Sequence, residues 1–197
     1  GFAYGQLCKN DFLKILSIIE SIYHNMKPNN KIMQEIYDKN KSMKVCLLSI
    51  FKMLRPFINR NHIMMMEGIS NGSGLDLDDV IIITMIPELY HQHCMLISTD
   101  TVFIRTLDFF FYMDNHLLRI YHNKNSYSYC ELGIPGTIWC ITAVSENLLC
   151  IGETSNRLKY ETNLLGTPFY LYFKEIMMET KNINETLKYL EKIKKNN

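Results

Sequence analysis

A cysteine, an arginine and an aspartate are spaced so that they could meet at one end of a short β-hairpin. Cys94 precedes two apolar runs that predict the hairpin, and Arg105 and Asp108 follow them. A thiolate is a nucleophile, and an α-amino group with a pKa of about 7.7–8.0 can take up the thiol proton of its own residue. Cleavage of the chain just before Cys94 would create that pair of groups. The residue types therefore suggest an N-terminal cysteine nucleophile, with Asp108 orienting the amine and Arg105 binding a carboxylate or holding the site together. A buried core thiol is the alternative.

His91, His93 and Cys94 allow another interpretation, since imidazole and thiolate are common zinc ligands. The three residues are close in sequence, and no clear fourth ligand accompanies them. A polar linker before the hairpin would show the same pattern. Zinc stays open as an alternative, and we expect neither a metal nor an organic cofactor if Cys94 is a nucleophile.

The elements that would position these residues change type at Cys94. Before it, apolar spacing and capping residues predict helices. These helices cover residues 12–26, about 31–54, 63–69 and 80–86. Pro56 closes the second helix, the turn Asn71-Gly-Ser-Gly74 ends the third, and Asp76 caps the fourth.

After Cys94, short runs rich in Ile, Tyr and Leu predict strands. A hairpin turns over Thr99-Asp100, and the strand segments are 95–98, 101–104, 117–121, 127–132, 137–144 and 148–152. Two helices follow, one beginning at Thr167-Pro168 and one capped by Asn182. Helices, then strands, then helices predict an α+β fold and not a βαβ repeat. We expect one integrated domain, with a helical segment over 1–93 and a β-sheet segment over 94–197.

Composition limits the classes of function. The chain has 197 residues, 47% of them apolar, and a formal net charge of +1, which is typical of a soluble globular domain. Basic residues in the first 60 positions follow helical faces without clustering, so we expect no nucleic-acid partner. The longest apolar run, Val80–Ile86, is too short for a transmembrane helix, which needs about 20 residues. Six cysteines without CxxC spacing predict reduced thiols. That pattern favours the cytoplasm, and a lysosomal or secreted location would require a signal that has been removed.

Five stretches, in order along nearly the whole chain, carry a resemblance to a known family. They are Gly1-Phe-Ala-Tyr-Gly-Gln6, Met66 to Leu89, Cys94 with Arg105-Thr-Leu-Asp108, Gly133-Ile-Pro-Gly136, and Gly166-Thr-Pro168. They resemble the opening Gly-x-x-x-Gly element, the helical lead-in, the nucleophilic cysteine with its Arg-Asn-Leu/Met-Asp motif, a Gly-x-Pro-Gly strand start and a late Gly-x-Pro helix. The family is the isopenicillin-N (acyl-CoA:6-aminopenicillanate) acyltransferase-like family. Its members are N-terminal-nucleophile (Ntn) cysteine hydrolases, more distantly similar to acid ceramidase.

The resemblance implies a four-layer αββα sandwich, incomplete here because the chain stops before typical members do. It implies a zymogen that cuts itself: Cys94 attacks the His93 carbonyl, and an N-to-S acyl shift followed by hydrolysis frees the Cys94 amine. The thiolate would then attack a linear amide, and the thioester would pass to water in an amidase or to an amine in an acyltransferase. The implied partners are a small-molecule amide or acyl thioester, and the cut chain would persist as an α/β heterodimer.

Several residues depart from the family pattern. Thr106 stands where Asn is usual, and Lys174 stands where Arg is common. The oxyanion-binding Asn should fall near Asn156, which needs a small gap, while Glu153 occupies the direct alignment and would repel an oxyanion. His93 stands where a small residue is usual. These departures keep a second hypothesis open, a non-catalytic relic or interaction domain that retains the fold.

Overall fold

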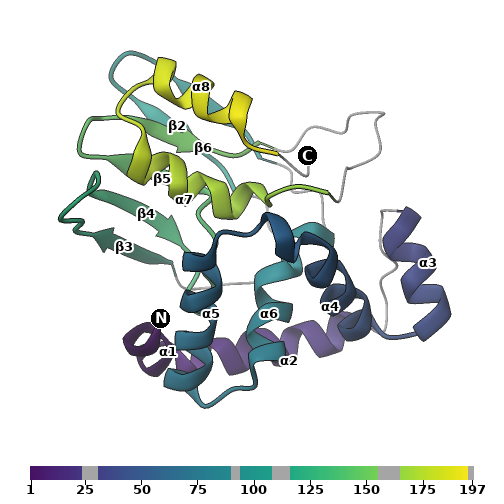
Figure 1. Cartoon of the computed structure of the whole chain (residues 1–197). Coiled ribbons are helices and arrows are strands. Elements are labelled where there is room, and N and C mark those ends of the chain that lie inside the picture. Colours follow the sequence, from purple (N-terminus) through teal and green to yellow (C-terminus); the bar gives the residue numbers. More distant parts are fainter. Residues whose placement is uncertain (24–30, 90–93, 108–115, 155–164, 195–197) are drawn as a thin grey trace.

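The helices of the first half of the chain occupy one part of the protein, and the antiparallel strands with the two C-terminal helices occupy the other (Figure 1). The structure is a computed structural model that describes residues 1–23, 31–89, 94–107, 116–154 and 165–194. The helices of the first half are α1 (Phe2–Leu7), α2 (Lys9–Tyr23), α3 (Lys31–Asn40), α4 (Met43–Leu54), η1 (Arg55–Phe57), α5 (Arg60–Ser73), α6 (Leu77–Met85) and η2 (Ile86–Leu89). The strands are β1 (Leu96–Ser98), β2 (Phe103–Arg105), β3 (Leu117–Tyr121), β4 (Tyr129–Gly133), β5 (Thr142–Ser145) and β6 (Cys150–Gly152), and α7 (Phe169–Glu179) and α8 (Ile183–Lys192) follow. The α+β class predicted from the order of elements is therefore confirmed.

The strands form two antiparallel units. One is a four-stranded sheet in the order β3-β4-β5-β6, in which each strand pairs with the next one along the chain. The other is the predicted hairpin, β1–β2, but its register is not the predicted one: Leu96 pairs with Arg105, whereas a turn over Thr99-Asp100 would pair Leu96 with Phe103. The predicted strand over 137–144 is wrong in its first half, because β5 begins only at Thr142. The residues before β5 form hydrogen bonds with residues outside the sheet. The Cys140 N–H donates to the Tyr170 carbonyl, and the Trp139 indole donates to the Thr84 carbonyl.

The two faces of the four-stranded sheet have different neighbours. One face packs on α7, where Met177 shares a buried cluster with Tyr129 and Ala143. The opposite face, called the outer face below, carries Leu118, Ile120 and Leu132, and 46–61% of each of these residues is exposed. Among the described residues, the helices therefore cover only one side of the sheet.

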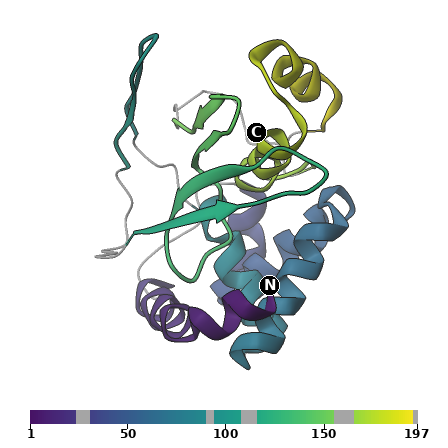
Figure 2. The same cartoon turned by 90° about the vertical axis from the view of Figure 1, so that its left-hand side faces the viewer.

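The hairpin β1–β2 lies over the β6 end of the outer face. A Cβ added to Gly152 would lie 2.8 Å from both Leu96 Cδ1 and Phe103 Cζ, so the hairpin approaches β6 at a position that only glycine permits. Figure 2 shows the hairpin on the side of the sheet that faces away from the helices. This contact brings the end of β2 close to the residues that follow β6.

The N-terminal helices differ from the prediction at two places. The single helix predicted over about 31–54 is wrong, because α3 ends at Asn40, Lys41 has a positive φ of 52°, and Ser42 caps α4 through the Val45 N–H. The predicted third helix is too short, because α5 runs through Asn71 and Gly72 to Ser73 and ends at Gly74 in the left-handed conformation. The sequence around Lys41 gives no signal that a helix ends there. The glycines near the end of α5 are residues typical of a turn, which is why the sequence predicts too early an end.

Close packing of α1 on α5 explains why α5 contains glycines. A Cβ at Gly5 would overlap the Ile69 carbonyl oxygen, and a Cβ at Gly72 would overlap the carbonyl of Phe2. The two helix backbones are therefore in direct contact, which side chains at these positions would prevent. Helix α1 itself was not predicted as a helix.

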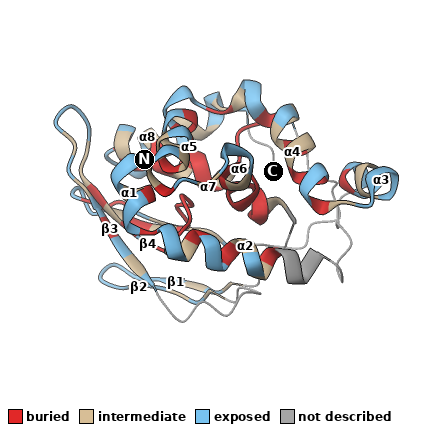
Figure 3. Ribbon diagram, turned by 90° about the horizontal axis from the view of Figure 1, so that it is seen from below, coloured by how far each residue is buried: buried red, intermediate tan, exposed pale blue. Residues whose placement is uncertain are grey.

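The main core contains residues from both sides of Cys94. Helices α2, α4, α5 and α6 contribute to one buried cluster, and Trp139, Tyr170 and Leu171 belong to the same cluster. Buried residues gather between the helices and the sheet (Figure 3). No helix within the described ranges combines the length and the apolar character needed to cross a bilayer.

Candidate functional site

Cys94 and Arg105 meet at the base of the hairpin. Arg105 Nη2 lies 3.1 Å from Cys94 Sγ and 3.0 Å from Glu153 Oε2. The Cys94 thiol in turn lies 3.9 Å from Glu153 Oε2, within the range of a sulfur hydrogen bond. A thiol, a guanidinium and a carboxylate therefore contact one another in pairs.

Strand geometry explains how these residues come together. Side chains alternate along a strand, and Leu96 pairs with Arg105, so Cys94, two residues before Leu96, lies on the same face of the hairpin as Arg105. That face is turned toward β6, whose last residue, Gly152, admits the hairpin. Glu153 follows directly after β6 and so lies opposite Arg105.

Arg105 is held by several groups of the protein. Its Nε donates to the Glu153 carbonyl at 2.7 Å, and its Nη1 donates to Thr142 Oγ1 at 2.9 Å. Only 3% of the Arg105 side chain and 11% of the Glu153 side chain are exposed. All three guanidinium nitrogens donate within the protein. Arg105 therefore has a fixed orientation and links β2 to β5 and to the residue after β6.

The electrostatics of the site suit proton transfer. Burial raises the pKa of the Glu153 carboxyl, and the neighbouring Arg105 and Cys94 offset only part of that rise. A carboxylate with a raised pKa is a better proton acceptor than an ordinary surface glutamate. The positive charge on Arg105 favours an adjacent thiolate over the neutral thiol. Cys94 is half-buried, so its environment is neither fully solvated nor sealed.

The structure brings together only part of the predicted site. Cys94 and Arg105 are in contact, whereas Asp108 and Asn156 lie outside the described residues. Glu153, which the sequence suggested would repel an oxyanion, is paired with Arg105 in the structure. Thr142 was not anticipated, and nothing in its sequence context marks it, because its role depends on which strand lies beneath the hairpin.

The other candidates are placed as follows. His91 and His93 lie outside the described residues, and within the described ranges no group of three or more His, Cys, Asp or Glu residues could hold a metal ion. Lys174, noted at a position where Arg is common, does not reach Cys94 and instead pairs with Glu131 on the helical side of the sheet.

A second buried polar cluster joins three helices. His62 Nε2 of α5 lies 3.0 Å from Glu175 Oε1 of α7, and the Tyr189 hydroxyl of α8 donates to Glu175 Oε2. Burial alone would raise the pKa of Glu175, but the hydrogen bonds from His62 and Tyr189 outweigh it and hold the pKa below its usual value. These contacts dock α8, in which no residue is fully buried.

Comparison with known proteins adds no assignment. No protein-family model matches the chain, and no curated protein gives a significant match.

Proposed function

We propose that this chain is an Ntn-type cysteine amidohydrolase or acyltransferase that becomes active when it cuts itself before Cys94. The observation that carries the proposal is the contact of Cys94 Sγ with Arg105 Nη2 at 3.1 Å, beside a Glu153 carboxyl with a raised pKa. A nucleophile, a cation that favours its ionised form and a proton acceptor are the groups that a cysteine-dependent acyl transfer requires. The resemblance described above gives the same assignment to Cys94 and Arg105.

The first reaction in this proposal is self-cleavage. In the uncut chain the Cys94 nitrogen is an amide and cannot act as a base, so Glu153 Oε2 accepts the thiol proton. The thiolate attacks the His93 carbonyl carbon, the peptide C–N bond breaks as Glu153 gives the proton to the leaving nitrogen, and the acyl group passes to sulfur while the nitrogen becomes the new α-amine. Water then hydrolyses the thioester, which leaves a free carboxylate on His93 and a free thiol on Cys94.

The second reaction uses the new amine. The α-amino group of Cys94 takes the thiol proton, Asp108 orients the resulting ammonium, and the thiolate attacks a linear amide of a small molecule. The thioester that forms passes to water or to an amine. Asn156 is the proposed oxyanion donor. For Arg105 we propose that it favours the thiolate and holds the site together and does not bind a substrate carboxylate, because its nitrogens already donate to Cys94, Thr142 and Glu153.

The αββα architecture is part of the same proposal. The apolar outer face of the sheet, with Leu118, Ile120 and Leu132 exposed, is suited to packing against a second β-layer. The hairpin β1–β2 already lies over one end of that face at Gly152. We therefore assign the hairpin to the second layer of the sandwich.

The competing function is a non-catalytic interaction domain. It is favoured by Glu153, because an ionised carboxylate 3.9 Å from the sulfur would repel the oxyanion that forms during acyl transfer. In that reading the Arg105–Glu153 pair only joins the hairpin to the sheet.

Intact-mass measurement under denaturing conditions decides between the two functions. Purified protein would be incubated between mildly acidic and neutral pH and compared with Cys94→Ala and with Cys150→Ala, a control at an exposed thiol. The enzyme predicts two species, one ending at His93 and one beginning at Cys94, in the wild type and in Cys150→Ala but not in Cys94→Ala. A single uncut chain in all three samples would refute self-cleavage and favour the interaction domain.

A further inference from the structure

The hairpin is closed at the candidate site by a side chain and not by main-chain bonds alone. Beyond the Leu96–Arg105 pair, the Thr106 N–H donates to the Met95 carbonyl at 2.9 Å. The reciprocal bond is different, because the Met95 N–H donates at 3.0 Å to Thr106 Oγ1 and not to the Thr106 carbonyl. Thr106 therefore binds both main-chain groups of Met95.

The two hydrogen bonds between Met95 and Thr106 lie next to both Cys94 and Arg105. Met95 directly follows Cys94, and Thr106 directly follows Arg105. The contact between Cys94 Sγ and Arg105 Nη2 thus joins two residues whose neighbours are held to each other by two hydrogen bonds. If the Thr106 hydroxyl were lost, the Met95 N–H would lose this acceptor, and of the two hydrogen bonds between Met95 and Thr106 the one from the Thr106 N–H would remain.

The site is sensitive to such a change because its contacts are short. Arg105 is buried and its guanidinium is fixed by Thr142 and by Glu153, so Arg105 cannot follow a displaced sulfur. The main chain at Cys94 is the adjustable part, since residues 94 and 95 precede β1. Reaction rates depend strongly on such geometry, and a displacement of about 1 Å can reduce a rate by about a hundredfold.

We propose that Thr106 is a positioning residue for Cys94, in which the side-chain hydroxyl, by accepting the Met95 N–H, sets the sulfur against Arg105. The inference rests on the proposed function, because the positioned group is the nucleophile of that reaction. It adds a residue that does not touch the substrate and that acts through Met95.

The test compares Thr106→Val, which keeps the shape and the main-chain bond but removes the acceptor, with Thr106→Ser, which keeps the hydroxyl. Thr101→Val is the matched control at the hairpin turn, because the contact of Thr101 in the structure uses its main-chain N–H. Two quantities are measured for each protein. One is the rate of cleavage before Cys94 by intact mass, and the other is the rate of Cys94 alkylation against pH by peptide mass spectrometry.

We expect Thr106→Val to slow cleavage by about tenfold or more and to move the pH profile of alkylation, with Thr106→Ser and Thr101→Val close to the wild type. Thermal unfolding of each variant shows whether the fold is kept, and rescue by serine separates the hydroxyl from a general loss of structure. Wild-type cleavage and alkylation profiles in Thr106→Val would overturn the inference, and so would a defect of equal size in Thr106→Ser. If the wild type itself is never cut, the proposed function fails, and the alkylation profiles still decide whether Thr106 positions Cys94.

Discussion

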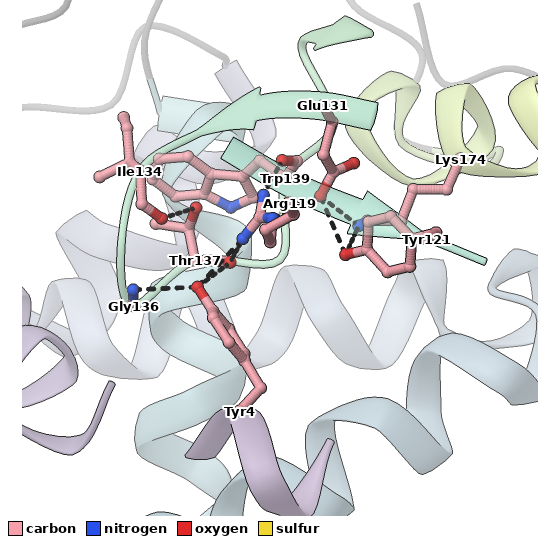
Figure 4. A network of polar contacts seen from close by, with 9 residues as sticks. All are labelled: Tyr4, Arg119, Tyr121, Glu131, Ile134, Gly136, Thr137, Trp139 and Lys174. Atoms are coloured by element: carbon pink, nitrogen blue, oxygen red, sulfur yellow. Dashed lines mark hydrogen bonds and ion pairs between the residues drawn. The ribbon is translucent and has the colours of Figure 1, made fainter. Parts of the chain in front are cut away.

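A buried charge network on the helical side of the sheet gives a prediction that does not depend on function. Glu131 of β4 is fully buried between two cations, with Arg119 Nε at 2.5 Å and Lys174 Nζ at 2.8 Å from its Oε1 (Figure 4). The Tyr121 hydroxyl donates to the same oxygen at 3.0 Å. Arg119 also donates to the carbonyls of Thr137 and Trp139. One carboxylate therefore balances two buried positive charges.

Glu131→Gln keeps the size of the side chain but removes the only anion of this network. Two buried cations would then face a neutral amide, and breaking a buried ion pair in this way costs about 3–5 kcal/mol. Lys174→Met removes one cation and leaves Arg119 and Glu131 as a balanced pair, so we expect a smaller loss of about 1–3 kcal/mol. In the double variant the loss should be smaller than the sum of the two by about 1 kcal/mol or more, because the second change relieves part of the imbalance.

The assay is urea unfolding followed by circular dichroism and by fluorescence. Trp139 is the single tryptophan, and its carbonyl accepts from Arg119, so its emission reports on the network directly. The four free energies of unfolding, for the wild type, both single variants and the double variant, give the coupling energy. A cost below about 1 kcal/mol for Glu131→Gln, or strict additivity in the double variant, would refute the reasoning.

The pH dependence provides an independent check. Burial alone would raise the pKa of Glu131, but Lys174 and Arg119 outweigh burial and hold the pKa below its usual value. A carboxyl with a lowered pKa in the folded state stabilises the protein above the unfolded pKa of about 4.3, and that stabilisation is lost as the pH falls through the folded pKa. The wild type should therefore lose stability below about pH 4.3 more steeply than Glu131→Gln. Equal slopes in the two proteins would contradict the lowered pKa.

Three further predictions concern the helices and the cut chain. Gly5→Ala should cost about 1–3 kcal/mol in urea unfolding, because its Cβ would overlap the Ile69 carbonyl, and an unchanged midpoint would show that α1 does not pack this closely. Tyr189→Phe should cost about 1–3 kcal/mol, because the Glu175 carboxylate loses one hydrogen bond; a melting temperature lowered by less than about 2 °C would count against this contact. A chain cut before Cys94 should elute from a native sizing column as one species, since both fragments share a core, and separate peaks would contradict this.

Local signals in the sequence predicted much of the secondary structure. The strand over 117–121 and the presence of a hairpin after Cys94 are confirmed, because both depend on residues within the element, whereas the hairpin register expected from a turn over Thr99-Asp100 is wrong. The cap of α8 is also confirmed, since the Glu185 N–H donates to Asn182 Oδ1 at 3.0 Å. Asp76 is at the predicted N-cap position of α6, but its side chain makes no capping bond. The position of a helix start was thus easier to predict than the bond that stabilises it.

The errors arose where distant contacts override the local pattern. Gly72 reads as part of a turn, yet it lies inside α5 because α1 packs against it. Residues 137–141 read as a strand, yet the Trp139 indole and the Cys140 N–H bond to Thr84 and Tyr170. Neither partner is near in sequence, so no window of neighbouring residues contains the information.

The candidate site shows the same division between local and distant information. Cys94 and Arg105 were predicted together because one hairpin contains both, whereas Glu153 and Thr142 join them only through the contact of the hairpin with β5 and β6. These four residues share one property: none of them precedes Cys94 in the chain. The hydrogen bonds among these four residues would therefore survive a cut before Cys94, while the helices of residues 1–89 stay attached through the shared core. A self-cutting protein needs this arrangement, since its cleaved peptide must not be what holds the nucleophile in place. An interaction domain has no such requirement.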